Sequence, residues 1–197
     1  MSSPLRNGDT PPPRLPSPAV GRHHFHSTVS EKKIRRLNAL ILLLRLAAFC
    51  FSLAAAIFMA TNSSRSPGSH SWLHFHPFRL VLASNAIVAV YSFFEMVSSI
   101  WEILKGVTLF PEPLQLWFDF SHDQVFAYLL LAAEAAATVE AQGLKGAHTC
   151  SPESAFCVQA YISVALGFAG FAFLALAALG SGFRVACYVI TGSRFHL

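Results

Sequence analysis

The chain has 197 residues, of which 54% are hydrophobic and only 12% are charged. This composition excludes an ordinary soluble globular protein, because such a fold could not bury so much apolar surface. The formal net charge of +4 does not indicate nucleic-acid binding, since the basic residues gather before the first apolar block and not along a groove-binding element. The apolar residues come in long blocks, which is typical of helices that cross a bilayer.

Residues 1–36 form a polar leader that is rich in Pro, Ser, Arg and His. The leader lacks the apolar content needed to offset the entropy of folding, so we predict a disordered cytoplasmic tail. Its stretch PPPRLPSP, residues 11–18, favours polyproline II and suits an aromatic-lined groove, but a plain flexible tail is the preferred interpretation.

Four apolar blocks follow, and each is close to the ~20 residues that cross a hydrocarbon layer about 30 Å thick. Each block is predicted to be helical, because lipid offers the backbone no hydrogen-bond partners. The predicted fold class is an all-α membrane protein, a four-helix transmembrane bundle at residues 37–190 with a short tail at 191–197. The predicted spans are residues 37–60, 80–104, 120–139 and 158–182.

Basic residues are concentrated on one side of these spans. The side that holds both chain ends carries most of them, including Lys105 between spans two and three. The opposite side carries only three: Arg65, Arg79 and Lys145. The excess of Lys and Arg on the cytoplasmic side of membrane proteins therefore predicts that both termini are cytoplasmic.

The first span contains Arg45, about 12 Å from its cytoplasmic start. A charge at this depth costs roughly 2.5–3.5 kcal/mol or more unless it is paired, so a partner is expected. The alternative is a guanidinium that snorkels alone to the interface. In the outer loop that follows, Asn62 begins an Asn-Ser-Ser sequon. Because Asn62 lies almost at the bilayer, we expect little glycosylation there.

The second span contains Glu95, about 13 Å from its cytoplasmic end and in the same leaflet as Arg45. The third span contains Asp123, about 5 Å from its cytoplasmic start. We predict that Arg45 pairs with Asp123 and that Glu95 is a further acceptor for the guanidinium, which would join spans one, two and three. The alternative for Asp123 is an N-cap of span three near the headgroups. Four aromatic residues of span two are expected to face lipid or its interface: Tyr91, Phe93, Phe94 and Trp101.

The third span also contains Glu134, about 21 Å from its start and nearer the outer leaflet. It follows Asp123 by eleven residues, close to three helical turns, so both carboxylates project from one face. A face with two acids is compatible with a proton or cation path. A protonated Glu134 that is hydrogen-bonded to another helix is the preferred interpretation.

Two features of the last third of the chain bear on loop structure and lipidation. Cys150 and Cys157 lie in the second outer loop, where an oxidising compartment favours a disulfide worth about 2 kcal/mol, with two free thiols as the alternative. Cys187, near the cytoplasmic end of span four, is a candidate for S-palmitoylation, and an inert thiol is equally compatible.

Small residues are frequent in spans three and four and let helix backbones approach closely. The same surfaces are suited to contact between copies of the chain. The small residues are Ala132, Ala133, Ala135, Ala136 and Ala137 in span three and Ala165, Gly167, Ala169, Gly170 and Ala172 in span four.

No catalytic motif is visible in the sequence. There is no Gly-rich phosphate loop, nucleophile elbow or zinc-protease helix. Histidine gathers mainly in the leader and first outer loop, away from where a membrane haem would need paired axial ligands. We therefore expect no enzyme activity, no cofactor and no metal.

Several of the residues described above occur together in one known family. They are Arg45, the segment ASNAIVAVY with Asn85 and Tyr91, the run DQVFAYLLLAA from Asp123 to Ala133, and the paired Cys150 and Cys157. Over roughly residues 37–190 the chain resembles the Casparian strip membrane protein and CASP-like family of plants, which is related to the MARVEL four-span proteins. Glu134 departs from the pattern, since a small or hydroxyl residue is expected there. The first outer loop lacks the signature of the true Casparian proteins.

The resemblance implies a multi-pass plasma-membrane protein that forms homo- and hetero-oligomers with CASP-like relatives. It also implies contact with membrane lipid and with proteins that modify the cell wall. The leading hypothesis is a non-enzymatic scaffold that oligomerises laterally. The alternative is a small proton or cation transporter or channel that uses Asp123, Glu134 and Glu95.

Overall fold

The computed structural model describes residues 28–62, 75–105, 111–146 and 155–191. These residues form four long helices, and the described part of the chain contains no strand. The helices are α1 (Thr28–Ala60), α2 (His76–Lys105), α3 (Glu112–Gly146) and α4 (Ala155–Thr191). The predicted all-α fold with four long apolar helices is confirmed, and all four helices are long and apolar enough to cross a membrane.

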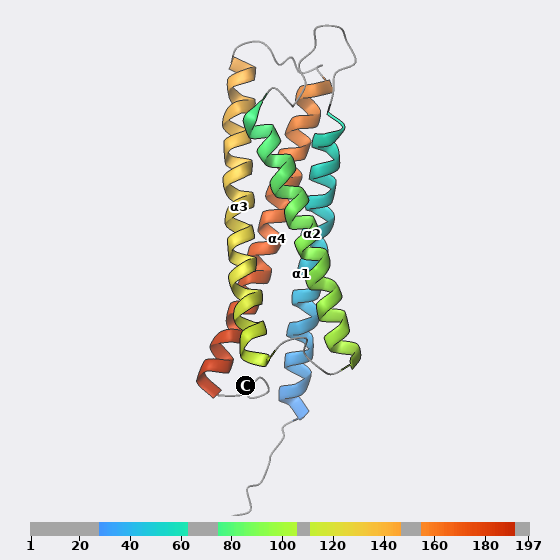
Figure 1. Cartoon of the computed structure of the whole chain (residues 1–197), viewed down its shortest axis with the longest axis vertical. Coiled ribbons are helices and arrows are strands. Elements are labelled where there is room, and N and C mark those ends of the chain that lie inside the picture. The colour runs from blue at the N-terminus through green and yellow to red at the C-terminus, as the bar shows by residue number, and fades with distance from the viewer. Residues whose placement is uncertain (1–27, 63–74, 106–110, 147–154, 192–197) are drawn as a thin grey trace, which may run out of the picture.

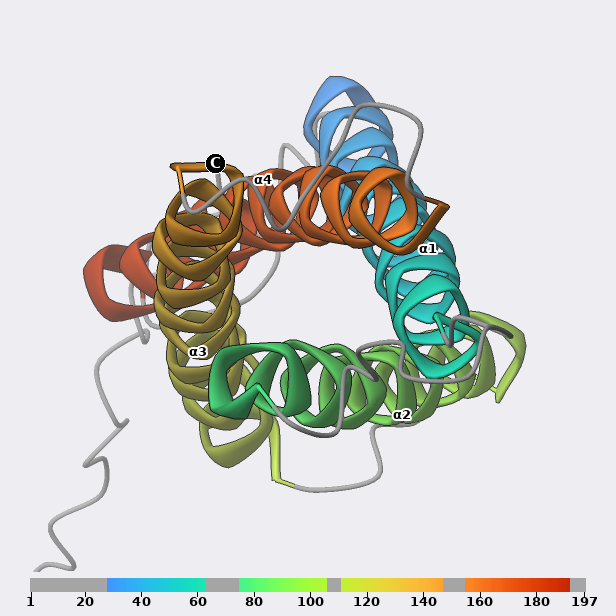
Figure 2. The same ribbon diagram turned by 90° about the horizontal axis from the view of Figure 1, so that it is seen from above.

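The helices run up and down and form a closed ring in the order α1, α2, α3, α4 (Figure 2). Each helix packs on its two neighbours in this ring, and α4 makes its most extensive contacts with α1 and α3. The start of α1 and the end of α4 lie at the same end of the bundle, which we call the terminal end (Figure 1). The end of α2 and the start of α3 also lie at the terminal end, because consecutive helices run in opposite directions.

The helices are longer than the apolar blocks that predict them. Helix α1 begins at Thr28, so the prediction of a disordered tail as far as residue 36 is wrong for residues 28–36. The physical reason is that this segment is rich in Lys, Arg and Glu and contains neither Gly nor Pro, so helix propensity carries the helix past the apolar block. The leader before it, residues 1–27, and the last residues, 192–197, lie outside the described residues.

Helix α3 also begins well before its predicted start at residue 120. It starts at Glu112, and Pro113 lies in its first turn, where the missing amide N–H and the fixed backbone angle of proline are tolerated. Asp123 is therefore more than two turns inside the helix. The alternative in which Asp123 is an N-cap is wrong.

The interior of the bundle is built largely from small and branched apolar side chains. Two glycines of α4 show how closely the helices approach: a Cβ atom on Gly170 would lie 2.8 Å from Ser52 Oγ, and one on Gly180 would lie 2.8 Å from Ile41 Cγ1. Fully buried alanines of α1, α3 and α4 also let the helix backbones approach closely. They include Ala48, Ala55, Ala133, Ala137 and Ala177.

The outer surface is apolar and aromatic over much of α2. Phe93, Phe94 and Trp101 are exposed on the outside of the bundle, as expected for side chains that face lipid. Tyr91 does not follow this pattern. Its ring packs on Phe126 of α3 with centroids 4.4 Å apart, and its hydroxyl points into the bundle. The expectation that Tyr91 faces lipid is wrong, because its hydroxyl has a buried acceptor.

Candidate functional site

Arg45 of α1 is buried inside the bundle, with 1% of its surface exposed. Its guanidinium makes two ion pairs through separate nitrogens. Nη1 lies 2.8 Å from Glu95 Oε2 of α2, and Nη2 lies 2.8 Å from Asp123 Oδ2 of α3. The structure thus brings together the three residues that were predicted to pair, within one copy of the chain. The alternative in which Arg45 snorkels alone to the interface does not describe this structure.

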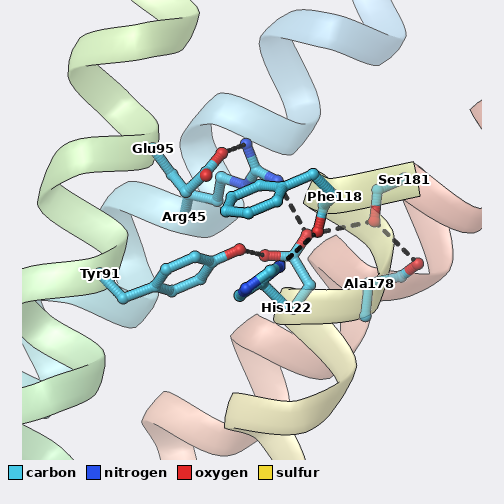
Figure 3. A network of polar contacts seen from close by, with 8 residues as sticks. Arg45, Tyr91, Glu95, Phe118, His122, Ala178 and Ser181 are labelled. Carbon is cyan, nitrogen blue, oxygen red and sulfur yellow. Dashed lines mark hydrogen bonds and ion pairs between the residues drawn. The ribbon is translucent and has the colours of Figure 1, made fainter. Parts of the chain in front are cut away.

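Asp123 is fully buried and receives hydrogen bonds from the other three helices. Figure 3 labels the three donors, Arg45, Tyr91 and Ser181. Arg45 of α1 donates to Oδ2 at 2.8 Å. The hydroxyl of Tyr91 in α2 donates to Oδ1 at 2.8 Å, and the hydroxyl of Ser181 in α4 lies 3.1 Å from Oδ2. One carboxylate therefore joins α3 to every other helix. We call Arg45, Tyr91, Glu95, Asp123 and Ser181 the Arg45 cluster.

The geometry of the Arg45 cluster follows from the chemistry of its members. A guanidinium presents donors in a fixed planar fork, so it can serve two carboxylates from two helices at once. A carboxylate has about four lone-pair sites, and Asp123 uses three of them. In a low-dielectric interior these charge-assisted bonds are stronger than neutral ones, and each offsets part of the cost of burying the charges.

Sequence reasoning missed four members or neighbours of this site. Tyr91 was placed outside, and Ser181 was not considered because a single serine in an apolar span carries little signal. Asp119 is also buried and lies one turn before Asp123 on the same helix face, but it fell outside the predicted span. His122, which also lies in α3, packs against Phe118 at the edge of the site, with the ring centroids 3.7 Å apart and the rings tilted by 32°.

A second buried polar contact lies farther from the terminal end, between α2 and α3. Asn85 Nδ2 donates to Glu134 Oε1 at 2.6 Å, and both side chains are fully buried. The carboxyl group faces Gly167 of α4, where an added Cβ atom would overlap it. Glu134 thus has a hydrogen-bond partner on another helix, of the kind the sequence analysis preferred, and the partner is Asn85.

The remaining predicted sites lie toward the ends of the bundle. Asn62 is fully buried, and its Nδ2 atom, to which a glycan would be attached, donates to the Phe156 carbonyl at 3.1 Å. This burial is consistent with little glycosylation. Cys157 is buried at the start of α4, but Cys150 lies outside the described residues, so the disulfide stays a prediction. Cys187 is partly buried in the last turns of α4, and its lipidation also stays a prediction.

The fold and the Arg45 cluster together define a class of protein. It is a multi-pass membrane protein whose four helices are joined by one buried arginine and its acidic partners. The chain belongs to the Casparian strip membrane protein family, because the model of the Casparian strip membrane protein domain matches residues 34–192, nearly all of the described bundle.

Relatives of the chain are plant proteins of similar length. The chain is 59% identical to CASP-like protein 4C1 of Ricinus communis, with all of both chains covered. It is 54% identical to CASP-like protein 4C1 of Arabidopsis thaliana, over all of this chain and 99% of the relative. It is 44% identical to CASP-like protein 4C3 of Physcomitrium patens, over 83% of this chain and 90% of the relative. No solved structure matches the chain.

Proposed function

We propose that the chain is a non-enzymatic scaffold of the plasma membrane that oligomerises laterally and organises a membrane domain for local cell-wall modification. Its partners in this proposal are copies of itself, CASP-like relatives and proteins that act on the wall. Membership of the Casparian strip membrane protein family supports the proposal. The observation that carries it is the way the chain distributes its polar and small residues between interior and exterior.

The charged groups of the Arg45 cluster find their partners within one copy of the chain. The ionised groups of the Arg45 cluster face each other inside the bundle, so the charges of the spans are not presented to lipid. A copy of this kind can move in the bilayer as a closed unit. It can also contact a second copy without exposing a buried charge.

Eight of the ten small residues predicted to mediate helix contact divide into two groups, and the other two, Ala136 and Ala169, are half-buried. Ala133 and Ala137 of α3 and Gly167 and Gly170 of α4 face the interior of the copy. Another set remains exposed on the outer surface, where small side chains let a neighbouring helix approach closely. The exposed set comprises Ala132, Ala135, Ala165 and Ala172. We take this exposed set as the surface for lateral contact.

The experiment compares oligomerisation of the wild type with that of variants that add bulk to the exposed set. Two differently tagged copies are expressed together, solubilised and captured by one tag. The expected result is that wild-type copies are recovered together and that Ala132→Leu/Ala135→Leu reduces the recovery at least about fivefold, since ~1 kcal/mol of lost packing changes an association constant by that factor. The matched control is Ala86→Leu, at an exposed alanine of α2.

If the second tagged copy of the wild type is not recovered with the first at any expression level, the proposal is contradicted. The transport alternative is tested on the same preparation reconstituted in vesicles. A proton or cation flux that disappears in Glu134→Gln would favour transport. An absence of flux together with stable oligomers is the outcome that the scaffold predicts.

A further inference from the structure

The carboxyl group of Glu134 is buried, and the side chain that donates a hydrogen bond to it, Asn85, is uncharged. Asn85 Nδ2 donates one hydrogen to Glu134 Oε1 at 2.6 Å and the other to the Val81 carbonyl at 2.9 Å. Both N–H bonds of the amide are therefore used. The other oxygen of each side chain is not accounted for by these contacts.

Two oxygen atoms at this contact have no hydrogen-bond partner, although both are buried: Glu134 Oε2 and Asn85 Oδ1. If the carboxyl group were ionised, both atoms would be acceptors and neither could satisfy the other. A buried acceptor without a donor is costly, and an uncompensated charge costs far more. The contact lacks one donor.

No charged side chain among the described residues compensates Glu134. Among the α1 side chains that the structure describes, the charged ones are Arg45, which is engaged by Glu95 and Asp123, and Arg36, which is exposed. The basic residue of α2 nearest in sequence to Asn85 is Arg79, which is exposed on the surface, and α4 has only Arg184, more than four turns from Gly167. On α3 itself the charged residues nearest in sequence on either side are two further acids, Asp123 and Glu140, and Lys145 near the end of the helix is exposed.

Helix α4 closes the remaining side of the contact. An added Cβ atom on Gly167 would lie 2.9 Å from Glu134 Oε2 and would overlap Oε1. The absence of a side chain at residue 167 makes room for the carboxyl group and brings backbone against it. The enclosed space suits the smallest donor that can complete the contact.

We propose that Glu134 and Asn85 form a proton-binding site between α2 and α3. The proton is taken up from solvent onto Glu134 Oε2, which becomes a hydroxyl donor, and Asn85 Oδ1 is the unpartnered acceptor it serves. One proton thereby removes the charge and satisfies both buried oxygens, with no other group oxidised, reduced or displaced. This site does not depend on the scaffold function.

The proposal is tested by infrared spectroscopy of the full chain reconstituted in phosphatidylcholine vesicles at neutral pH. The expected result is a carbonyl band of a protonated carboxylic acid that shifts in D₂O and is absent from Glu134→Gln. Glu140→Gln, at a partly exposed acid on the same helix, is the matched control and keeps the band. If the wild type and Glu134→Gln show the same carboxylic-acid bands, the proposal is overturned.

A second variant separates the site from a merely buried acid. Asn85→Leu removes the amide, so the acid band is expected to remain and to move to the higher frequency of a more weakly hydrogen-bonded carbonyl. An unchanged band would show that the amide does not serve the acid and would overturn the pairing.

A third test compares how the melting temperature of each protein changes with pH. Because each protein is compared with itself, a general loss of stability in a variant does not affect the comparison. Loss of the proton at alkaline pH places a charge among uncharged groups, so the melting temperature of the wild type is expected to fall by about 3 °C or more relative to neutral pH. In Glu134→Gln the side chain has nearly the same size and shape but cannot ionise, so its melting temperature is expected to fall less than that of the wild type. Equal falls in both proteins would overturn the proposal.

Discussion

At the scale of single residues, Arg45 compensates the charges of two buried acids, Glu95 and Asp123. Glu95 and Asp123 both direct carboxylate oxygens at its guanidinium from 2.8 Å. Removing one partner of a buried ion pair leaves the other charge without compensation, which is more costly than never having had the pair. The interaction is therefore better judged by removing the whole set than by removing one member.

Removing Arg45 alone is expected to destabilise the protein more than removing Arg45 together with both of its partners. Arg45→Met is expected to lower the free energy of unfolding by about 3–5 kcal/mol, because two carboxylates lose their cation. The triple variant Arg45→Met/Glu95→Met/Asp123→Leu is expected to recover more than half of that loss, since the two carboxylates that lost their cation are then removed as well. The measurement is reversible unfolding in bicelles, followed by circular dichroism.

Two controls define the outcome of this experiment. Arg36→Met, at an exposed arginine on the same helix, is expected to change the stability by no more than about 0.5 kcal/mol. Ser181→Ala removes one neutral donor to Asp123 and is expected to cost about 1 kcal/mol. A cost for Arg45→Met as small as that of Arg36→Met would show that the ion pairs contribute nothing.

At the scale of helices, α2 and α3 are held together by polar contacts as well as by packing. Their packing is the least extensive in the ring, yet the two hydrogen bonds Tyr91–Asp123 and Asn85–Glu134 both join them. In lipid there is no hydrophobic drive to hold helices together, so hydrogen bonds and close packing must do so. The two contacts lie about three turns apart on α3 and fix both the register and the rotation of the helix.

The next prediction tests how α4 accommodates Glu134. Gly167→Ala is expected to cost about 1–3 kcal/mol, because the added methyl group overlaps the carboxyl group of Glu134. In a Glu134→Ala background the same substitution is expected to cost less by at least about 1 kcal/mol, since the space is then empty. A double-mutant cycle on unfolding free energies measures this coupling. Gly180→Ala, which meets Ile41 instead, is expected to be additive with Glu134→Ala.

At the scale of the whole molecule, the sequence was sufficient for the bundle but not for its details. Block lengths and lipid's lack of hydrogen-bond partners predict four helices, and matching depths predict that Arg45 meets Asp123 and Glu95. Tyr91 and Ser181 were missed because depth does not give the rotation of a helix about its axis, and that rotation depends on packing. Helix ends were missed because they depend on local propensity and on proline, which hydropathy does not measure.

The arrangement of the ends leads to a prediction about topology. Both described ends, at Thr28 and Thr191, lie at the terminal end of the bundle, so tags on the two termini must lie on the same side of the membrane. The concentration of Lys and Arg on that side predicts that it is the cytoplasm. In intact plant protoplasts, tags at either terminus are therefore expected to resist an external protease and to be cut after permeabilisation. The end of α3 and the start of α4 lie at the opposite end of the bundle. A tag inserted in the sequence between them is the matched control and is expected to be cut in intact cells. Cleavage of one terminal tag but not the other in intact cells would contradict the four-span topology. Cleavage of both tags in intact cells would show that the orientation is the reverse of the predicted one, and it would not contradict the bundle or its Arg45 cluster.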